Sequence, residues 1–284
     1  MIVEDSESLQ GWRASLSHSR EGRVKVVFDK EMAGQYDSWY LSPAGRHVER
    51  MENDLILDLL KPAKGQSLLD VGCGTGNHLL FFRQMGLEVV GVDPSEAMLG
   101  VARDKLGPTA DLHLAWAEDL PFDDNSFDIV TLITSLEFSH RPFLALQEAF
   151  RVARAKVFIG ALNPVSANGI HRKVEAVFRK TVYGQARFYS VWELRYMVRR
   201  VLGVCKVEWG SVIFLPLPLH GWDRALCRWI PRRRNPFGAF VGILVEILYT
   251  HQATLLPLGR GWLGGRRAQV SPAGTAAGAL GTQG

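Results

Sequence analysis

The sequence has few cysteines and no long hydrophobic run. Three cysteines occur in 284 residues (Cys73, Cys205, Cys227), and none lies in a CxxC pair or near a histidine at ligand spacing. This pattern excludes a disulfide framework and a zinc site, so we expect no metal and a reducing compartment. The most apolar late stretch, 237–249, contains Glu246 and is shorter than the ~20 residues needed to span a bilayer.

The N-terminus lacks the features of a signal peptide. It reads MIVEDSESLQGW and opens with acids, whereas export requires a basic segment followed by an apolar one. We therefore expect a soluble, cytoplasmic protein.

Acidic residues are scarce after residue 150. The first 150 residues contain 13 basic and 24 acidic side chains, and the remainder contains 20 basic and 5 acidic ones. The net charge of +4 therefore divides into about −11 and about +15, which indicates two surfaces that face different partners.

Short apolar runs alternate with segments of helical period from residue 67 onward. This alternation is typical of an α/β domain with a parallel sheet and helices on both faces. Gly86 is assigned to the end of one helix and Pro94 to the start of the next. The predicted strands are 67–71, 88–92, 111–115, 127–133, 156–162, 206–215 and 238–247, and the predicted helices are 28–39, 48–60, 77–85, 94–105, 141–154, 191–201 and 222–230.

Composition also divides the chain into segments. We expect residues 1–27 to form an N-terminal extension and residues 28–263 to form one domain. Within it, residues 163–189 interrupt the alternation with a basic amphipathic stretch and should lie over the carboxyl edge of the sheet as a substrate cap. Residues 264–284 are rich in Gly and Ala, which predicts a disordered tail.

The most informative segment is a glycine-rich turn, LLDVGCGTGN at 68–77. Its third glycine comes one residue too early for the GxGxxG fingerprint and no GK[ST] follows, which excludes a pyrophosphate site and a P-loop. Asp93, at the end of the next strand, is placed to hold a ribose diol and can share a pocket with Asp70. Two carboxylates without a phosphate-binding element favour a neutral or cationic nucleoside ligand, and S-adenosyl-methionine fits that description.

These residues resemble the class I S-adenosyl-methionine-dependent methyltransferases, in the small-molecule subgroup that includes ubiquinone/menaquinone C-methyltransferases. The resemblance covers roughly residues 28–247, and it implies a Rossmann-like, seven-stranded, mostly parallel sheet with helices on both faces and an antiparallel last strand. The segments that carry it are YDxW (36–39), LLDVGCGTG (68–76), VVGVDPSEAML (89–99), AEDLPFDDNSFDIV (117–130) and ALQEAFRVA (145–153).

The resemblance also assigns residues to the parts of the cofactor S-adenosyl-methionine. The methionine part is covered by Tyr36 and cradled by Asp70, Gly72 and Gly74, the ribose is held by Asp93, and the adenine is contacted by Met98, Ala117 and Glu118.

Three positions depart from the family pattern or lie inside its motifs without a set role. Trp116 stands where many relatives have an acid that contacts the adenine amino group, so Trp116 either packs in the core or stacks on the ligand. Phe138 stands where many relatives have a histidine. Cys73 lies between two glycines with no base beside it in sequence and is interpreted as a small packing residue.

A general base is optional for methyl transfer, because alignment supplies most of the acceleration. The catalytic candidates are Glu137 and His140, which follow the fourth strand, and further candidates in the insertion are His171 and Tyr189. A packing or surface role stays open for each of them.

The acceptor is expected to be a small molecule. The basic, aromatic-rich second half of the chain suits an anionic or aromatic acceptor. Alternatively, its arginines could hold the enzyme on an anionic membrane, where it would methylate a lipid or quinone. A nucleic-acid substrate is not favoured, because the sequence contains no recognisable RNA-binding module or target-flipping motif. A cofactor-binding regulator without turnover is the alternative from a different class.

Overall fold

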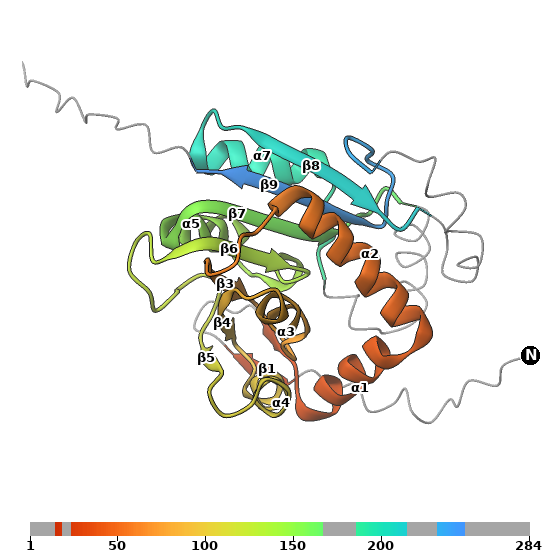
Figure 1. The fold of residues 1–284 in the computed structure, drawn as a ribbon, viewed down its shortest axis with the longest axis vertical. Coiled ribbons are helices and arrows are strands. Elements are labelled where there is room, and N and C mark those ends of the chain that lie inside the picture. The colour runs from red at the N-terminus through yellow and green to blue at the C-terminus, as the bar shows by residue number, and fades with distance from the viewer. Residues whose placement is uncertain (1–14, 19–23, 167–185, 215–231, 248–284) are drawn as a thin grey trace, which may run out of the picture. The chain divides into compact units, whose positions relative to one another are not determined.

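The computed structural model describes residues 15–18, 24–166, 186–214 and 232–247. Its main element is a seven-stranded sheet of order β5-β4-β3-β6-β7-β9-β8 (Figure 1). The strands are β3 (Ser67–Val71), β4 (Glu88–Asp93), β5 (Asp111–Leu114), β6 (Phe127–Ile133), β7 (Ala153–Leu162), β8 (Val207–Val212) and β9 (Phe240–Glu246).

The sheet is parallel except at one strand. β3 pairs in parallel with β4 and β6, and the same direction continues to β5 and β7. β9 lies antiparallel between β7 and β8. The predicted fold class, a mostly parallel seven-stranded sheet with an antiparallel last strand, is therefore confirmed.

Helices cover both faces of this sheet (Figure 1). Helices α2 (Pro43–Leu60) and α3 (Asn77–Gln84) pack on one face through a buried cluster that includes Leu55, Phe82 and Phe158. On the opposite face, α5 (Pro142–Val152) and α7 (Val191–Leu202) share a cluster with the alternate residues of the central strands. The remaining α-helices are α4 (Glu96–Leu106) and α1 (Lys30–Leu41), and α1 contacts both α2 and α4.

Side-chain caps decide where two helices begin. α2 starts at Pro43 because the Ser42 hydroxyl accepts a hydrogen bond from the Gly45 N–H at 3.0 Å, so this helix is longer than the predicted 48–60. α4 starts at Glu96 because Ser95 caps it, and the prediction that Pro94 begins this helix was wrong by two residues. Gly86, with φ of +86°, follows the end of α3 as predicted.

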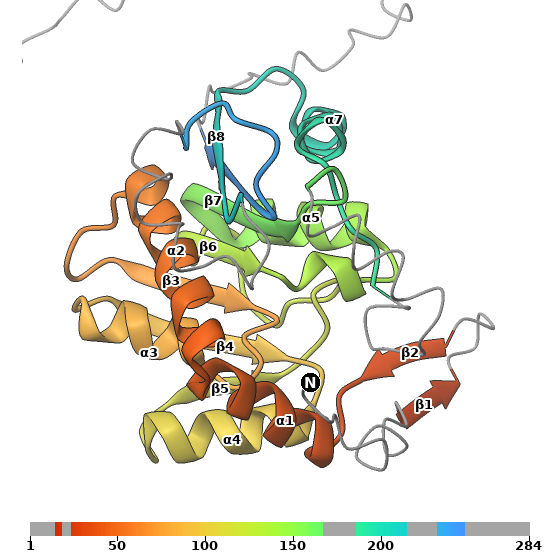
Figure 2. The same cartoon turned by 90° about the vertical axis from the view of Figure 1, so that its right-hand side faces the viewer.

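One element was not predicted. Residues 15–18 (β1, Ser15–His18) and 24–27 (β2, Val24–Val27) form an antiparallel two-stranded sheet, visible at the right of Figure 2. The predicted helix at 222–230, most of the insertion at 163–189 with His171, and the predicted tail at 264–284 lie outside the described residues. No helix among the described residues is both long enough and apolar enough to cross a membrane.

Candidate functional site

The candidate site is an open cavity at the carboxyl ends of β3, β4 and β6. In Figure 2 the arrowheads of these parallel strands point to the same side of the sheet. The chain runs from β3 outward to β5 and then returns to β6 on the other side of β3, so the order of strands reverses there. Open α/β sheets bind ligands at such a switch point. The cavity measures about 810 Å³, a volume that includes solvent at its mouth.

Seven of the eight residues predicted to bind the cofactor line this one cavity, although they come from four separate segments of the chain. They are Tyr36, Gly72, Gly74, Asp93, Met98, Ala117 and Glu118. Trp116 lines it as well, which favours a ligand-facing position over a core position for this side chain.

The glycine turn brings bare backbone to the cavity. Gly72, Gly74 and Gly76 all have positive φ, at +75°, +53° and +78°, where L side chains are strained. A Cβ added to Gly72 would lie 2.4 Å from the Cβ of Ser135, so this position has no room for a side chain. A Cβ on Gly74 would meet nothing within 4 Å, so its backbone faces open space that a ligand can enter.

Asp93 is buried and held by two backbone donors. Its two carboxylate oxygens accept hydrogen bonds from the N–H groups of Gly74 and Ser95, each at 2.9 Å. Burial raises the pKa of Asp93 to about 6, and the two hydrogen bonds oppose that rise. Each carboxylate oxygen has two lone pairs, so both oxygens keep one with which to accept a hydrogen bond from a ligand diol.

Asp70 is the predicted cofactor residue that does not line the cavity. It is 2% exposed, and its Oδ1 accepts a hydrogen bond from the Thr131 hydroxyl at 2.7 Å. Burial raises the pKa of Asp70 to about 7, the Thr131 hydrogen bond lowers it, and the nearby Asp93 carboxyl raises it further. Asp70 therefore lies under the turn, where it contacts a neighbouring strand.

Several buried polar atoms around the turn have no hydrogen-bond partner among the described residues. The two that line the cavity are Nε2 of His78 and the hydroxyl of Ser135. Two more, Oγ1 of Thr75 and Nδ2 of Asn77, lie on either side of Gly76 in the turn. Burial lowers the pKa of His78 to about 4, so its imidazole is neutral at pH 7. Unpaired buried polar atoms are costly unless a ligand or water completes them.

Sequence reasoning did not assign several of the lining residues to the site. His78 lies two residues after the glycine turn, and no pattern in the sequence around it distinguishes a histidine that contacts a ligand from one that packs in the core. Ser135 and Phe138 follow β6, where an expected histidine is absent, and Phe28 precedes α1. The rings of Phe28 and Phe138 pack edge to face with their centroids 5.2 Å apart and form an aromatic wall.

The first helix is tied to the cavity by polar contacts. The Ser95 hydroxyl donates to the carbonyl of Phe28 at 2.5 Å. Lys105, on α4, contacts the carboxylate of Asp37 at 2.5 Å and the side-chain oxygen of Asn77. These contacts hold α1, and with it Tyr36, against the glycine turn.

Glu118 joins two of the loops that form the cavity wall. Its Oε1 accepts from the Ser139 hydroxyl at 2.7 Å and from the N–H groups of His140 at 3.0 Å and Arg141 at 3.2 Å. The loop after β5 is thereby fixed to the loop after β6.

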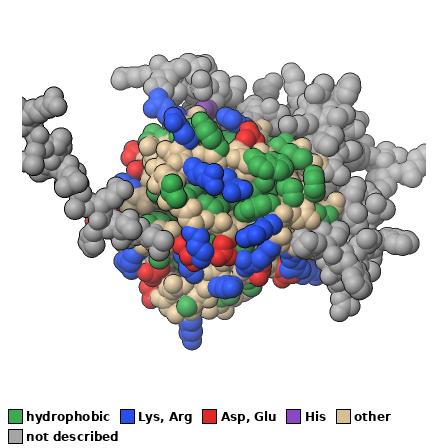
Figure 3. Space-filling view, turned by 90° about the horizontal axis from the view of Figure 1, so that it is seen from above, with side chains coloured by type: hydrophobic (Ala, Val, Ile, Leu, Met, Phe, Trp, Pro, Cys, Tyr) green, Lys and Arg blue, Asp and Glu red, His purple; other side chains and the backbone are tan. Residues whose placement is uncertain are grey.

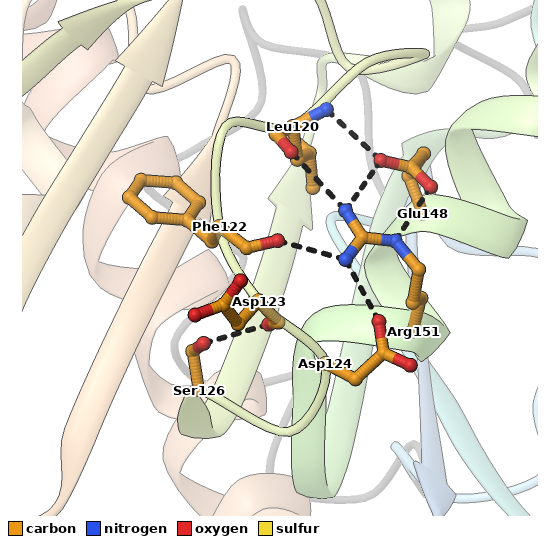
Figure 4. Close-up of polar contacts among 7 residues, drawn as sticks. All are labelled: Leu120, Phe122, Asp123, Asp124, Ser126, Glu148 and Arg151. Atoms are coloured by element: carbon orange, nitrogen blue, oxygen red, sulfur yellow. Dashed lines mark hydrogen bonds and ion pairs between the residues drawn. The ribbon is translucent and has the colours of Figure 1, made fainter.

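Arg151, on α5, fixes the rest of the loop after β5 (Figure 4). It donates to the carbonyls of Leu120 and Phe122 at 3.1 and 2.7 Å and pairs with Asp124 at 2.9 Å. Both carboxylate oxygens of Glu148 accept hydrogen bonds from its guanidinium, at 2.8 and 2.7 Å. These hydrogen bonds lower the pKa of Glu148. The segments 117–130 and 145–153, which carry the family resemblance, are therefore joined by one arginine.

The two predicted catalytic side chains do not line the cavity. Glu137 is 2% exposed, its Oε1 accepts from the N–H of Leu162 at 2.7 Å, and burial raises its pKa to about 7. Its Oε2, Nε2 of His140 and the hydroxyl of Tyr189 have no hydrogen-bond partner among the described residues. These groups lie in the sequence around the ends of β6 and β7, outside the set of residues that line the cavity.

Cys73 lines the cavity but is poorly suited to nucleophilic chemistry. Its thiol is 6% exposed, and burial together with the neighbouring carboxyls raises its pKa well above the usual value. Within the described part of the chain, no cluster of three His, Cys, Asp or Glu side chains is arranged to hold a metal ion.

Comparisons with known proteins agree with this geometry. Residues 69–159 match the family model described as a methyltransferase domain. The chain is 34% identical over 146 residues to a demethylmenaquinone methyltransferase of Clavibacter sepedonicus, covering 50% of this chain and 58% of that protein. It is 38% identical over 144 residues to a ubiquinone/menaquinone biosynthesis C-methyltransferase of Roseobacter denitrificans, covering 48% and 56%. The chain thus spans less than two thirds of these relatives' lengths.

The solved structures extend the likeness to most of the described fold. A SAM-dependent methyltransferase from Thermotoga maritima has a TM-score of 0.58 and 26% identity, covering 76% of this chain and 97% of that one. A putative methyltransferase bound to the Trm112 activator in Haloferax volcanii has a TM-score of 0.54 at 19% identity, which shows the fold alone. The resemblance to class I S-adenosyl-methionine-dependent methyltransferases is confirmed.

Proposed function

From the methyltransferase domain that residues 69–159 form, we propose that this protein transfers a methyl group from S-adenosyl-methionine to a small-molecule acceptor. The single observation that supports it most is the convergence of Tyr36, the glycine turn, Asp93 and Met98 on one cavity at the switch point of the sheet.

The residues at the cavity fit the proposed cofactor. Asp93 has lone pairs for a ribose diol, and the bare backbone at Gly74 leaves space beside it. The unpaired atoms of His78 and Ser135 offer hydrogen bonds to the polar groups of a ligand. The carboxyl of Asp93, which lines the cavity, favours a ligand that carries positive charge.

The mechanism that this site supports is alignment. When bound, S-adenosyl-methionine would supply a methyl group on a sulfonium, an electrophile with a good leaving group. The glycine turn and Asp93 would fix its position, and Tyr36 on the tethered α1 would keep water out. Proximity and orientation alone contribute up to about 7 to 11 kcal/mol in well-aligned reactions. No base is included, because Glu137 and His140 do not line the cavity.

The acceptor class that we propose is an aromatic small molecule. The cavity wall contains Phe28 and Phe138, and these rings offer edge and face contacts to a planar acceptor. Two of the relatives are named for the methylation of quinone precursors, which is consistent with a ring acceptor.

Calorimetry with S-adenosyl-homocysteine tests the cofactor part of the proposal. We expect the wild type to bind and Asp93→Ala to lose about a hundredfold in affinity, because hydrogen bonds to an ionised group are the strong ones. Asp104→Ala, which removes an exposed acid from α4, is the matched control and should bind as the wild type does. A wild type that does not bind, or an Asp93→Ala variant with unchanged affinity, would overturn the proposal.

A labelled-methyl transfer screen tests the reaction and the acceptor. Methyl transfer to an aromatic metabolite supports the proposed class. Transfer only to acceptors without a ring contradicts it, and cofactor binding without transfer to any metabolite or lipid contradicts the enzymatic function.

A further inference from the structure

Helix α7 buries one side and presents two aromatic rings on the other. Leu194 and Val198 are fully buried in the cluster shared with α5, whereas Trp192 is 54% exposed and Tyr196 is 59% exposed. Residues four apart lie on the same face of a helix, so the two rings are neighbours on the outside of α7. We call Trp192, Tyr196, Arg199 and Arg200 the α7 outer face.

The charge on this face is basic and not neutralised. Arg199 and Arg200 are exposed, and no ion pair joins either of them to another described residue. The one acid on the outside of α7, Glu193, is committed to the cap, since it accepts from the N–H and hydroxyl of Ser190 and lies 3.9 Å from Arg187. Figure 3, which looks onto the end formed by β8, β9 and α7, shows Lys and Arg side chains next to hydrophobic ones.

Several other arginines of the described residues form ion pairs. Arg232 and Arg233 contact Asp54 and Asp58 of α2, and Arg154 contacts Asp128. The α7 outer face therefore differs from those arginines in having unpaired cations beside exposed aromatic rings.

The start of α7 lies at the same edge of the sheet as the cavity. The N–H of Tyr189 donates to the carbonyl of Leu162 at the end of β7, at 3.1 Å, and the N–H of Arg187 donates to the carbonyl of Glu137 at 2.9 Å. Trp192 is on the first turn of α7. A surface that contacts Trp192 would therefore be close to the edge at which the cavity opens.

We propose that the α7 outer face docks on an anionic lipid bilayer. Trp and Tyr combine an apolar ring with a polar group and are the residues preferred at membrane interfaces. Unpaired arginines are attracted to anionic headgroups, and this attraction adds to the contribution of the rings. A second copy of the chain is the weaker alternative, because pairing two α7 outer faces would bring the arginines of both copies together, and like charges repel. This surface goes beyond the proposed methyl transfer and does not depend on it.

Flotation of the full chain with vesicles tests the proposal. We expect binding to vesicles of phosphatidylcholine mixed with phosphatidylglycerol, weak binding to phosphatidylcholine alone, and release at high salt. Arg199→Glu with Arg200→Glu should lower partitioning about tenfold or more, since each arginine near the surface contributes. Trp192→Ala with Tyr196→Ala should lower partitioning at low salt as well, although this variant keeps both arginines.

The matched control is Arg46→Glu with Arg50→Glu, two exposed arginines one turn apart on α2, on the opposite face of the sheet. This variant has the same change in net charge and should bind vesicles as the wild type does. An equal loss in both charge variants would overturn the proposal, because overall charge would then explain the binding. So would a wild type that fails to float, or one whose light scattering shows a dimer that the Trp192→Ala, Tyr196→Ala variant loses.

The outcome is separable from that of the proposed function. Affinity for S-adenosyl-homocysteine should be the same in all α7 variants, which also reports that they fold. Vesicle binding without any affinity for S-adenosyl-homocysteine would overturn the methyltransferase proposal and support this surface.

Discussion

The α7 outer face begins near the carboxyl edge of the sheet, where the cavity opens, yet the two regions hold polar groups in opposite ways. At the cavity and under its glycine turn, Asp93, His78 and Asp70 are buried, and burial shifts their pKa values towards the neutral form. On α7, Arg199 and Arg200 are exposed to solvent. The cavity therefore depends on backbone shape and protonation, whereas the α7 outer face depends on the kind of side chain and on ionic strength.

The largest expected effect is on protein stability and comes from a substitution in the glycine turn, where backbone conformation leaves no room for a side chain. Gly72→Ala should destabilise the protein by about 3 kcal/mol or more, because it places a side chain at positive φ and in overlap with Ser135. Gly100→Ala, in open space on α4, should instead stabilise it by about 0.5 to 1 kcal/mol. Urea unfolding measures both, and similar effects of the two substitutions would show that the turn is not constrained.

Protonation should distinguish the two regions next. The pKa values of Asp70, Glu137 and Asp93 are raised by burial to about 7, 7 and 6. Between about pH 4 and pH 7 these three carboxyls hold protons in the folded state that the unfolded chain has lost, so their contribution to stability falls as pH rises through these values. The buried neutral His78 opposes part of this fall below about pH 6.5, and the three carboxyls outweigh it. We expect the Tm to drop by about 5 °C or more from pH 5 to pH 8.

Two variants check the source of that pH dependence. Asp70→Asn keeps a side-chain acceptor for Thr131 and should flatten the fall in Tm. Arg199→Glu with Arg200→Glu should leave the slope between pH 5 and pH 8 unchanged. The same slope in Asp70→Asn as in the wild type would contradict the prediction.

Two arginines in one short segment give a smaller contrast. Arg151→Ala removes contacts to Leu120, Phe122 and Glu148 and should cost about 2 kcal/mol of stability and about tenfold in affinity for S-adenosyl-homocysteine. Arg154→Ala breaks only an exposed pair with Asp128 and should cost less than about 1 kcal/mol. Equal affinities in both variants would show that the loop after β5 does not support the ligand site.

The smallest effect concerns an unpaired atom. His78→Leu removes the buried Nε2 that lacks a partner and should raise the stability of the ligand-free protein by up to about 1 kcal/mol. It should also weaken S-adenosyl-homocysteine binding about fivefold to tenfold, because the ligand loses a hydrogen bond. His78→Gln, which keeps a polar end, should recover part of the affinity. If both variants bind as the wild type does, His78 does not contact the ligand.

Local sequence patterns were sufficient for the central elements of the fold. The strands 67–71 and 127–133 have the predicted bounds, because each is a buried apolar run that ends at a turn signal. The hairpin β1–β2 was missed because SLSH and VKVV are short and carry polar residues. The position of β9 between β7 and β8 was not predicted either, because strand order depends on contacts far apart in the chain.

The candidate site was predictable where a residue's neighbours are near it in sequence. Gly72, Gly74 and Asp93 follow from a strand that ends in a turn. Asp70 is in the same motif, yet it contacts Thr131 of the adjacent strand, a pairing between residues 61 positions apart. His78 is a ligand-facing candidate only because the fold buries its ring without a partner, which no sequence pattern reports.

The place of β9 also bears on the order in which the chain can assemble. Within the described sheet, β8 pairs only with β9, and β7 needs β9 to cover its outer edge, with Gly160 opposite Gly242. During synthesis, β8 emerges before its partner exists, and the exposed edge of β7 is open to other chains until residue 246 has been made. We therefore expect completion of the sheet to be a late step with a high contact order, slow relative to formation of β3 and β4.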